Sequence, residues 1–86
     1  MPLRLHPDVA TTDTDDGTVL LHQRTGRYWQ LNTTGSTMLR HLLDGHTPEA
    51  IAADLTDRYD IDQRQAERDV TAVLDQLRTA QLVVNP

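Results

Sequence analysis

The chain has 86 residues, with 8 Lys+Arg against 13 Asp+Glu and no cysteine. That length predicts a single domain over residues 1–86, and the lack of cysteine excludes disulfides, thiolate metal sites and a cysteine nucleophile. No stretch reaches the ~18 apolar residues that a membrane span needs, so we expect a cytoplasmic protein without a membrane partner. The net charge of -5 argues against nucleic acid as a partner, because binding to phosphates relies on a basic surface.

The first third of the sequence predicts three strands joined by two tight turns. Two β-prone runs, residues 9–12 and 18–22, flank an Asp16-Gly17 pair. This pair favours a hairpin because glycine takes the positive φ that such turns need. Thr25-Gly26 forms the second turn and leads into a third strand over residues 27–31. The pattern predicts an antiparallel meander whose third strand keeps one edge open.

Three helices are expected after the strands. The first begins at Thr33 or Thr34, either of which can cap it, and Gly45 ends it. Thr47 and Pro48 start the second helix as N-cap and first-turn proline. Strands followed by helices predict an α+β domain with a winged-helix-like arrangement, in which a three-stranded antiparallel meander precedes three helices.

The third helix has the clearest start signal, with Asp62 as cap and Gln65 in the capping-box position. A short strand over residues 82–84 is expected after it. Each helix carries an apolar stripe at helical spacing, which predicts its buried face. The stripes are Met38, Leu39, Leu42 and Leu43 in the first helix, Ile51, Leu55 and Tyr59 in the second, and Ala66, Val70, Val73, Leu74 and Leu77 in the third.

No group of residues indicates catalysis or metal binding. The acids of residues 13–16 lack the spacing of an EF-hand loop and are typical of a solvated turn. The four histidines have no ligand spacing and are expected at the surface. Ser36, the only serine, lies at a helix start without the flanking residues of a carrier-protein attachment site, so a phosphopantetheine carrier is a remote alternative. We therefore expect no enzyme activity, no metal and no cofactor.

A meander packed on three helices is also the architecture of many DNA-binding regulators. A DNA-reading helix is basic, whereas the third helix here carries three basic and three acidic residues. These are Arg64, Arg68 and Arg78 against Glu67, Asp69 and Asp75. A winged-helix DNA-binding regulator therefore stays as an alternative that the charge balance disfavours.

A family resemblance is carried by several short motifs taken in chain order. The motifs are DGTVLL at residues 16–21, TGRYWQLN at 25–32, TG at 34–35, LLDG at 42–45, TPEAIA at 47–52 and YDID at 59–62. Over residues 9–84 the chain resembles PqqD-like proteins, the peptide recognition elements of pathways that modify ribosomally made peptides. It is most similar to the recognition half of a split lasso-peptide B protein. The peptide chaperone of pyrroloquinoline quinone biosynthesis is the competing member of the family.

The resemblance implies a binding module that catalyses no step itself. Such a domain binds the leader segment of a precursor peptide and delivers it to a cysteine-protease-type leader peptidase and an ATP-dependent macrolactam cyclase. It also implies that a Tyr-x-x-Pro element of the leader is the anchor, with the tyrosine ring in an apolar pocket near the third helix.

The expected mechanism is addition of the leader as an extra strand at the open edge. A two-residue turn would pair Arg24 with Arg27, His22 with Trp29 and Leu20 with Leu31. Tyr28 and Gln30 would then direct their backbone groups outward. Tyr28 and Trp29 lie on opposite strand faces, and the sequence does not decide which of them packs inward. The candidate leader-binding residues are Arg27, Tyr28, Trp29, Gln30 and Leu31 on the strand, and Ala66, Asp69, Val70, Val73, Leu74 and Leu77 on the third helix.

Overall fold

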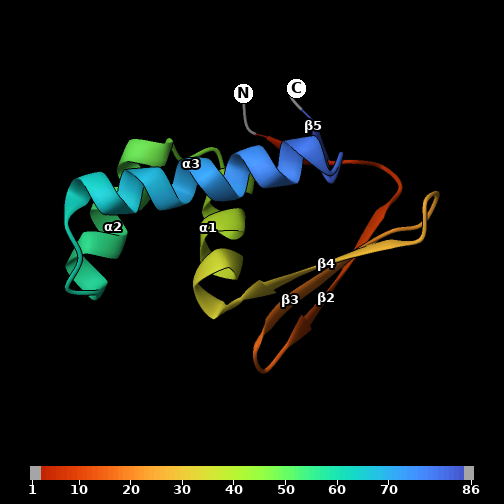
Figure 1. The fold of residues 1–86 in the computed structure, drawn as a ribbon, viewed down its shortest axis with the longest axis horizontal. Helices are drawn as coiled ribbons and strands as arrows, with labels where there is room; N and C mark the ends of the chain where they lie inside the picture. The colour runs from red at the N-terminus through yellow and green to blue at the C-terminus, as the bar shows by residue number, and fades with distance from the viewer. Residues whose placement is uncertain (1–2, 85–86) are drawn as a thin grey trace.

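A computed structural model describes residues 3–84 of the chain (Figure 1). It confirms the α+β domain, with a three-stranded antiparallel sheet followed by three helices. The strands are β1 (Arg4–Leu5), β2 (Val9–Thr14), β3 (Gly17–His22), β4 (Arg27–Asn32) and β5 (Val83–Val84). The helices are α1 (Thr33–Leu43), α2 (Pro48–Arg58) and α3 (Gln63–Thr79).

The hairpin predicted from the Asp-Gly pair is confirmed, but Gly17 is the first residue of β3 and not part of the turn. Thr14 pairs with Gly17, which leaves Asp15 and Asp16 as a two-residue turn. Gly17 has a φ of 145°, and a Cβ at this position would overlap the carbonyl oxygen of Leu31 on β4. Only glycine lets β3 and β4 approach each other this closely at the turn.

A second, two-stranded sheet joins the two ends of the described chain. β1 pairs antiparallel with β5, with Arg4 opposite Val84 and Leu5 opposite Val83. The strand near the C-terminus was expected, whereas β1 was not predicted because two residues carry too little pattern to be recognised. The ribbon lies beside the C-terminal end of α3 (Figure 1), and β5 pairs with β1 rather than with the three-stranded sheet.

Helix α1 begins at Thr33, as expected, but its N-cap is the residue before it. The N-cap is Asn32, whose Oδ1 accepts a hydrogen bond from the Gly35 N–H at 2.8 Å, so the prediction of Thr33 or Thr34 as cap is wrong. Asparagine is as good a cap as threonine, and the last residue of β4 is already extended. The left-handed Gly45 just after the helix, with φ 92°, is confirmed.

The caps of α2 and α3 follow the prediction, but two details differ. Thr47 caps α2, and Asp62 caps α3 by accepting from the Arg64 N–H at 3.0 Å. Gln65 makes no capping box, because its Nε2 donates to Asp69 Oδ1 at 2.9 Å instead. Tyr59 is 45% exposed at the C-cap of α2, so its expected place in the buried stripe is wrong.

The core consists of two adjoining clusters. One is formed between the three helices, by Met38, Leu42, Ile51, Ala52, Leu55, Ala66, Val70 and Leu74. The other lies between the sheet, α1, the end of α3 and the chain end, and is formed by Leu20, Leu31, Leu39, Leu77, Leu82 and Val83. Val73 contacts both clusters. Helix α3 therefore holds the helical half and the sheet half of the domain together.

Among residues 3–84 three polar side chains are buried, all in the sheet half, and two of them are hydrogen-bonded to each other. The Ser36 hydroxyl donates to Thr18 Oγ1 at 2.7 Å, and the Thr18 hydroxyl donates to Asp13 Oδ1 at 3.1 Å. This chain of hydrogen bonds uses the Ser36 hydroxyl to fix α1 to β3, which argues against its use as a carrier attachment site. His22 is 3% exposed, with its ring centroid 4.8 Å from that of His6, so the expectation of a surface residue is wrong for this histidine. No helix within residues 3–84 has the length and hydropathy to cross a membrane.

Candidate peptide-binding groove

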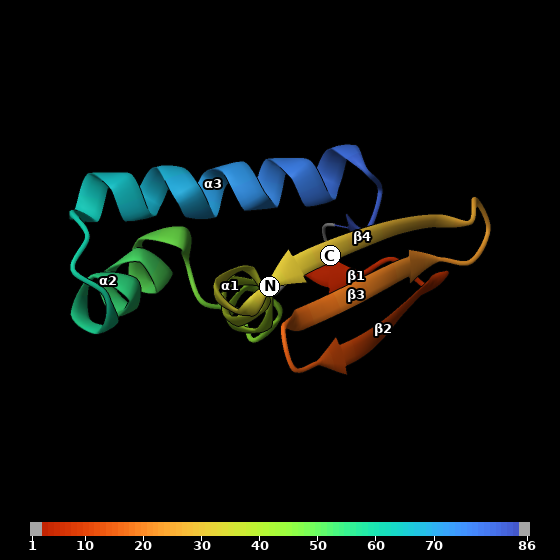
Figure 2. The same ribbon diagram turned by 60° about the horizontal axis from the view of Figure 1, so that its bottom comes forward.

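The three-stranded sheet has the order β2-β3-β4, which places β4 at an edge. Within residues 3–84 no strand pairs with the outer side of β4, since β5 pairs with β1 in the other sheet. Figure 2 shows β4 as the strand of this sheet that runs alongside α3. Strand edges carry unpaired N–H and C=O groups, and proteins commonly protect them with charge or proline. β4 has no proline and one charge, at its first residue, Arg27.

The β3–β4 register differs from the prediction by two residues. His22 pairs with Arg27, Leu20 with Trp29 and Thr18 with Leu31, so the connecting loop has four residues, 23–26, instead of two. The expected pairs of Arg24 with Arg27, His22 with Trp29 and Leu20 with Leu31 are therefore wrong. Gly26 does take a positive φ, of 74°, but as the last residue of this longer loop.

The outward-facing backbone groups of β4 follow from two hydrogen bonds at the end of β3. The Gln23 N–H donates to the Asp8 carbonyl on the β2 side, and the His22 carbonyl accepts from the Gly26 N–H on the β4 side. Backbone groups alternate along a strand, so every second residue of β3 from His22 backwards faces β4. Their β4 partners face β3 in return, which leaves Tyr28 and Gln30 with backbone groups directed outward. The predicted register was wrong by two residues, and an even error leaves the same β4 residues facing outward.

The structure also decides which β4 side chains face the core. Trp29 and Leu31 pack with the sheet half of the core, where Leu31 is 7% exposed and Trp29 is half-buried. Tyr28 points to the opposite face and is 73% exposed. Trp29 thus lies on the side of β4 that faces α3.

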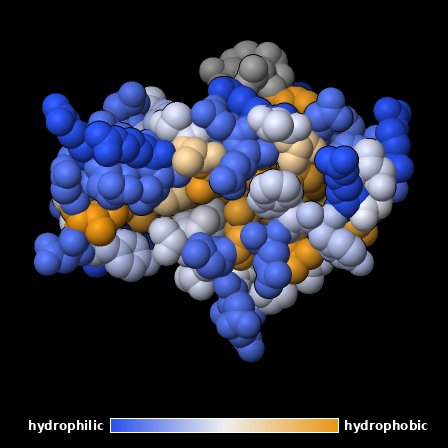
Figure 3. Space-filling model, in the orientation of Figure 1, coloured by the Kyte–Doolittle hydropathy of each residue, from blue (hydrophilic) through white to orange (hydrophobic). Residues whose placement is uncertain are grey.

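Two cavities lie beside α3, one at each end of β4, and this pair of cavities is called the groove below. The first, of ≈ 290 Å³, lies where β4 runs into α1 and is lined by Asn32, Thr34, Gly35, Met38, Asp69, Ala72 and Val73. The second, of ≈ 310 Å³, lies at the hairpin end of β4 and is lined by Arg27, Trp29, Asp75, Gln76, Thr79 and Ala80. Hydrophobic surface gathers just below α3, towards α1, in Figure 3.

The α3 wall of the groove is a single stripe at helical spacing. Positions 69, 72, 73, 75, 76, 79 and 80 line one or other cavity, each three or four positions from another of the set. From 69 to 80 a helix rises about 17 Å, and the six residues of β4 also span about 17 Å. The two cavities therefore lie at the two ends of β4, and α3 runs past the strand in the opposite direction.

The candidate residues on α3 occupy different places. Ala66, Val70 and Leu77 are 0% exposed and Leu74 is 9% exposed, so these four close the core behind the groove and offer almost no surface to a ligand. Val73 and Asp69 are half-buried and line the cavity at the α1 end. Gln65 fixes the Asp69 carboxylate at that end through the 2.9 Å hydrogen bond.

Five groove residues on α3 and its C-cap were not among the candidates: Ala72, Asp75, Gln76, Thr79 and Ala80. They lie beside the apolar stripe, not on it, because the stripe itself packs into the core. The signal that could have found them is the pair of alanines, whose small side chains let a peptide approach the helix closely.

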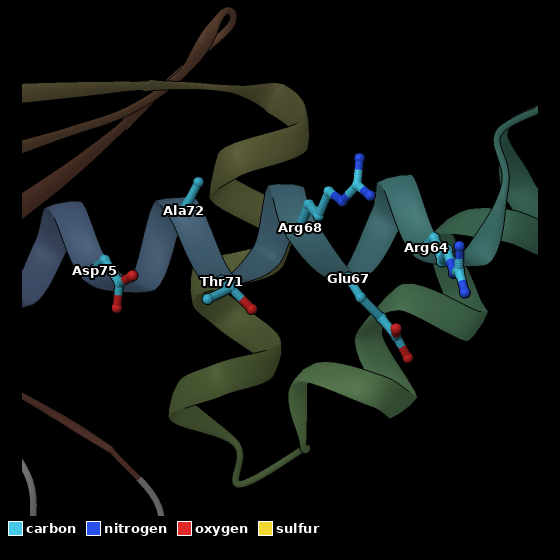
Figure 4. A pocket seen from close by; sticks show the side chains of 6 residues that line it. All are labelled: Arg64, Glu67, Arg68, Thr71, Ala72 and Asp75. Carbon is cyan, nitrogen blue, oxygen red and sulfur yellow. The ribbon is translucent and has the colours of Figure 1, made fainter.

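A wide, shallow cavity of ≈ 510 Å³ lies on the outward face of α3 (Figure 4). Its charged lining residues are Arg64 and Arg68 against Glu67 and Asp75, with Thr71 and Ala72 between them. Arg68 and Ala72 project from one side of the helix, and Glu67 and Asp75 from the other. This face has no net charge, unlike the basic recognition helix of a DNA-binding regulator. Within residues 3–84 no cluster of three or more His, Asp or Glu residues could hold a metal ion.

An open strand edge with a helix-lined groove beside it is the architecture that receives an extended peptide as an added strand. The family model for coenzyme PQQ synthesis protein D (PqqD) matches residues 17–83. The chain belongs to this PqqD family.

Two solved structures are similar over nearly the full length. One is a lasso peptide synthetase B1 complexed with the leader peptide, with 39% sequence identity and a TM-score of 0.91, covering 99% of this chain and 100% of that chain. The other is TbiB1 in complex with the TbiA(beta) leader peptide, with 31% identity and a TM-score of 0.83, covering 96% of each chain. A comparison with curated protein sequences finds no match.

Proposed function

We propose that this protein binds the leader segment of a ribosomally made precursor peptide, of the lasso-peptide type, as an added strand on β4. The observation that carries the proposal is the open β4 edge with two cavities between it and α3. The two similar structures, at 39% and 31% identity, are both complexes with leader peptides and support the same conclusion.

Backbone pairing alone gives the leader little net affinity. Tyr28 and Gln30 each offer one N–H and one C=O, and four hydrogen bonds at about 0.5–1.5 kcal/mol contribute about 2–6 kcal/mol. Ordering a disordered peptide costs about 2–5 kcal/mol. The two terms nearly cancel, so side chains in the two cavities supply the affinity and the specificity.

The spacing of the cavities fits two anchors about three residues apart. The α3 residues that line the two cavities are centred about six positions apart, which is about 9 Å along the helix. An extended peptide covers that distance in about three residues. A Tyr-x-x-Pro element, which the family resemblance implies, meets this spacing, with its ring beside Trp29 or beside Met38 and Val73.

The domain then delivers the bound precursor to enzymes and catalyses no step itself. We propose a cysteine-protease-type leader peptidase and an ATP-dependent macrolactam cyclase as these partners, in the cytoplasm, with no cofactor, metal or nucleic acid involved. The PqqD family match favours one second candidate, a peptide chaperone of pyrroloquinoline quinone biosynthesis. The two candidates use the same groove and differ in the precursor that fills it.

Titration of fluorescein-labelled leader peptides with the full chain, followed by fluorescence polarisation, tests the proposal. We expect saturable binding of the leader half of a lasso-peptide precursor. The core half of the same precursor, and a pyrroloquinoline quinone precursor, should bind at least tenfold more weakly. Tighter binding of the quinone precursor would favour the second candidate. No binding of any leader, or displacement of the leader by duplex DNA, would refute peptide recognition at the groove.

A further inference from the structure

His22 is the least exposed of the three buried polar side chains. It is 3% exposed, and its Nδ1 is buried without a hydrogen-bond partner among residues 3–84. Buried side-chain nitrogens nearly always have a partner, and a charge in such a place loses its hydration. The surroundings of this ring therefore suit an uncharged imidazole and offer nothing to a charged one.

The ring of His22 contacts the ring of His6, which belongs to the segment between β1 and β2. The two ring centroids are 4.8 Å apart, and the ring planes are inclined at 41°. The His6 N–H donates to the Leu82 carbonyl at 2.9 Å, which continues the pairing of β1 with β5 by one residue. The His6–His22 contact therefore fastens the ribbon of β1 and β5 to the three-stranded sheet.

The hydrogen bonding of His6 also requires an uncharged ring. Its Nδ1 accepts from the Asp8 N–H at 3.0 Å, and this bond uses the lone pair that a proton would take. Asp8 Oδ2 lies 4.0 Å from the same nitrogen and 3.6 Å from Arg24 Nε. A proton on Nδ1 would thus exchange a hydrogen bond for a long ion pair with a carboxylate that already has a cation.

The charged groups around His22 give it no counter-ion. Those on the neighbouring elements are Asp8 before β2, Arg24 after β3, Arg27 on β4, and Asp75 and Arg78 near the end of α3. Asp8 is paired with Arg24, and Asp75 lines the hairpin-end cavity together with Arg27. Arg27 lies directly opposite His22 across the strands, where like charges destabilise a sheet. Within residues 3–84 no ion pair includes His22.

We propose that the His6–His22 contact is an acid-sensitive lock, which holds the ribbon on the sheet only while both rings are uncharged. Imidazole gains its proton at about pH 6.5, and two charged rings in contact repel each other. Below that pH the ribbon of β1 and β5 leaves the sheet. This opening does not depend on the proposed function.

The lock acts on the groove through the end of α3. β5 follows soon after this helix, and Thr79 and Ala80 at the end of α3 line the hairpin-end cavity. Release of the ribbon frees this end of the helix, so the cavity loses part of its wall and binds the leader more weakly. This second step rests on the proposed function.

Proton linkage gives the size of the effect. An opening that takes up one proton becomes about tenfold more favourable for each pH unit below the pH at which imidazole protonates, and pH 5.5 lies about one unit below it. The His6 amide reports ribbon opening, because its hydrogen bond to Leu82 breaks. We expect its protection factor against hydrogen exchange to fall at least tenfold between pH 7.5 and pH 5.5. The Leu55 amide, in the helical half, should change less than twofold.

Three histidine variants separate the lock from general effects of acid. His22→Phe keeps an aromatic ring but cannot take a proton, so the protection factors at the two pH values should differ by less than threefold. His6→Phe removes the same contact from a half-buried position and should give the same result, whether or not β3 tolerates the larger ring. His46→Gln, at an exposed position outside the contact, is the matched control and should keep the tenfold fall.

Hydrogen exchange of the full chain, followed by NMR and expressed as protection factors, measures the opening. Fluorescence polarisation at the same two pH values measures the leader Kd, which should rise at least threefold at pH 5.5 for wild type and His46→Gln only. Equal protection of the wild-type His6 amide at both pH values would overturn the inference, as would an undiminished fall in His22→Phe and His6→Phe. An equal fall at Leu55 would show unfolding of the whole domain and would overturn it too. Failure of the wild type to bind leader at pH 7.5 would refute the proposed function but leave the exchange result standing.

Discussion

The Gln30→Pro substitution probes the added-strand mechanism most directly. The Gln30 N–H faces away from β3, so no backbone hydrogen bond within residues 3–84 depends on it. Its side chain is exposed on the outer sheet face. Proline is tolerated on an edge strand when its missing N–H would have pointed outward. We therefore expect the variant to keep the wild-type fold, with a free energy of unfolding within about 1 kcal/mol of wild type.

The loss of leader affinity can be worked out from the backbone pairing. Proline removes one hydrogen bond to the leader, worth about 0.5–1.5 kcal/mol, and leaves the facing leader carbonyl without its donor, at a cost of about 1–3 kcal/mol. The sum of about 1.5–4.5 kcal/mol corresponds to a rise in leader Kd of about 10- to 2,000-fold. The polarisation titration should therefore show a leader Kd at least about tenfold above that of the wild type.

The matched control is Thr11→Pro, which places a proline on the opposite edge of the same sheet. Alternation from the Gln23–Asp8 hydrogen bond leaves the Thr11 N–H also facing outward, but away from the groove. Its leader Kd should stay within twofold of wild type. Polarisation titration measures both variants, and circular dichroism with urea unfolding checks their fold. A leader Kd for Gln30→Pro within threefold of wild type, in a folded variant, would rule out strand addition at β4.

Three further substitutions test the turn, a cap and the groove. Gly17→Ala should lower the free energy of unfolding by at least about 1–3 kcal/mol, because the φ of 145° and the contact with β4 admit no Cβ. Gly26→Ala should cost less, because there is open space around Gly26. Equal urea unfolding midpoints of the two variants would contradict the argument. Asn32→Ala should cost about 0.5–2 kcal/mol by removing the cap of α1, measured in the same way, and an unchanged midpoint would show that the 2.8 Å bond contributes nothing. Ala72→Trp should fill the cavity at the α1 end and raise the leader Kd at least tenfold. Ala53→Trp, at an exposed position on α2, should leave the leader Kd unchanged. Equal leader Kd values of the two variants in the polarisation titration would exclude this cavity as a leader contact.

Local signals in the sequence determined where most elements begin and end. The Asp16-Gly17 pair, the Thr47 cap before Pro48 and the Asp62 cap each act within a few residues, so their consequences can be read without knowing the rest of the fold. The alternating direction of backbone groups along a strand is also a local signal. It predicted outward backbone groups at Tyr28 and Gln30, and the assignment survived a wrong loop length because the error was an even number of residues.

The groove itself depended on distant contacts. The apolar periodicity of α3 correctly identified a core stripe, but the wall that a ligand can reach is the neighbouring stripe, which includes Ala72, Gln76 and Ala80. A helix exposes one stripe or another only according to where other elements pack on it. In the same way, packing around β4 decided that Trp29 faces inward and Tyr28 outward.

The sequence by itself determined the order of strands and helices, the turns and caps, and an open third strand, because these depend on interactions between residues close together in the chain. Only the tertiary structure decided the four-residue loop, the burial of His22, the exposure of Tyr59 and the pairing of β1 with β5. Each of these joins residues from separate elements, and the free energy that selects them comes from burial and pairing across the whole domain.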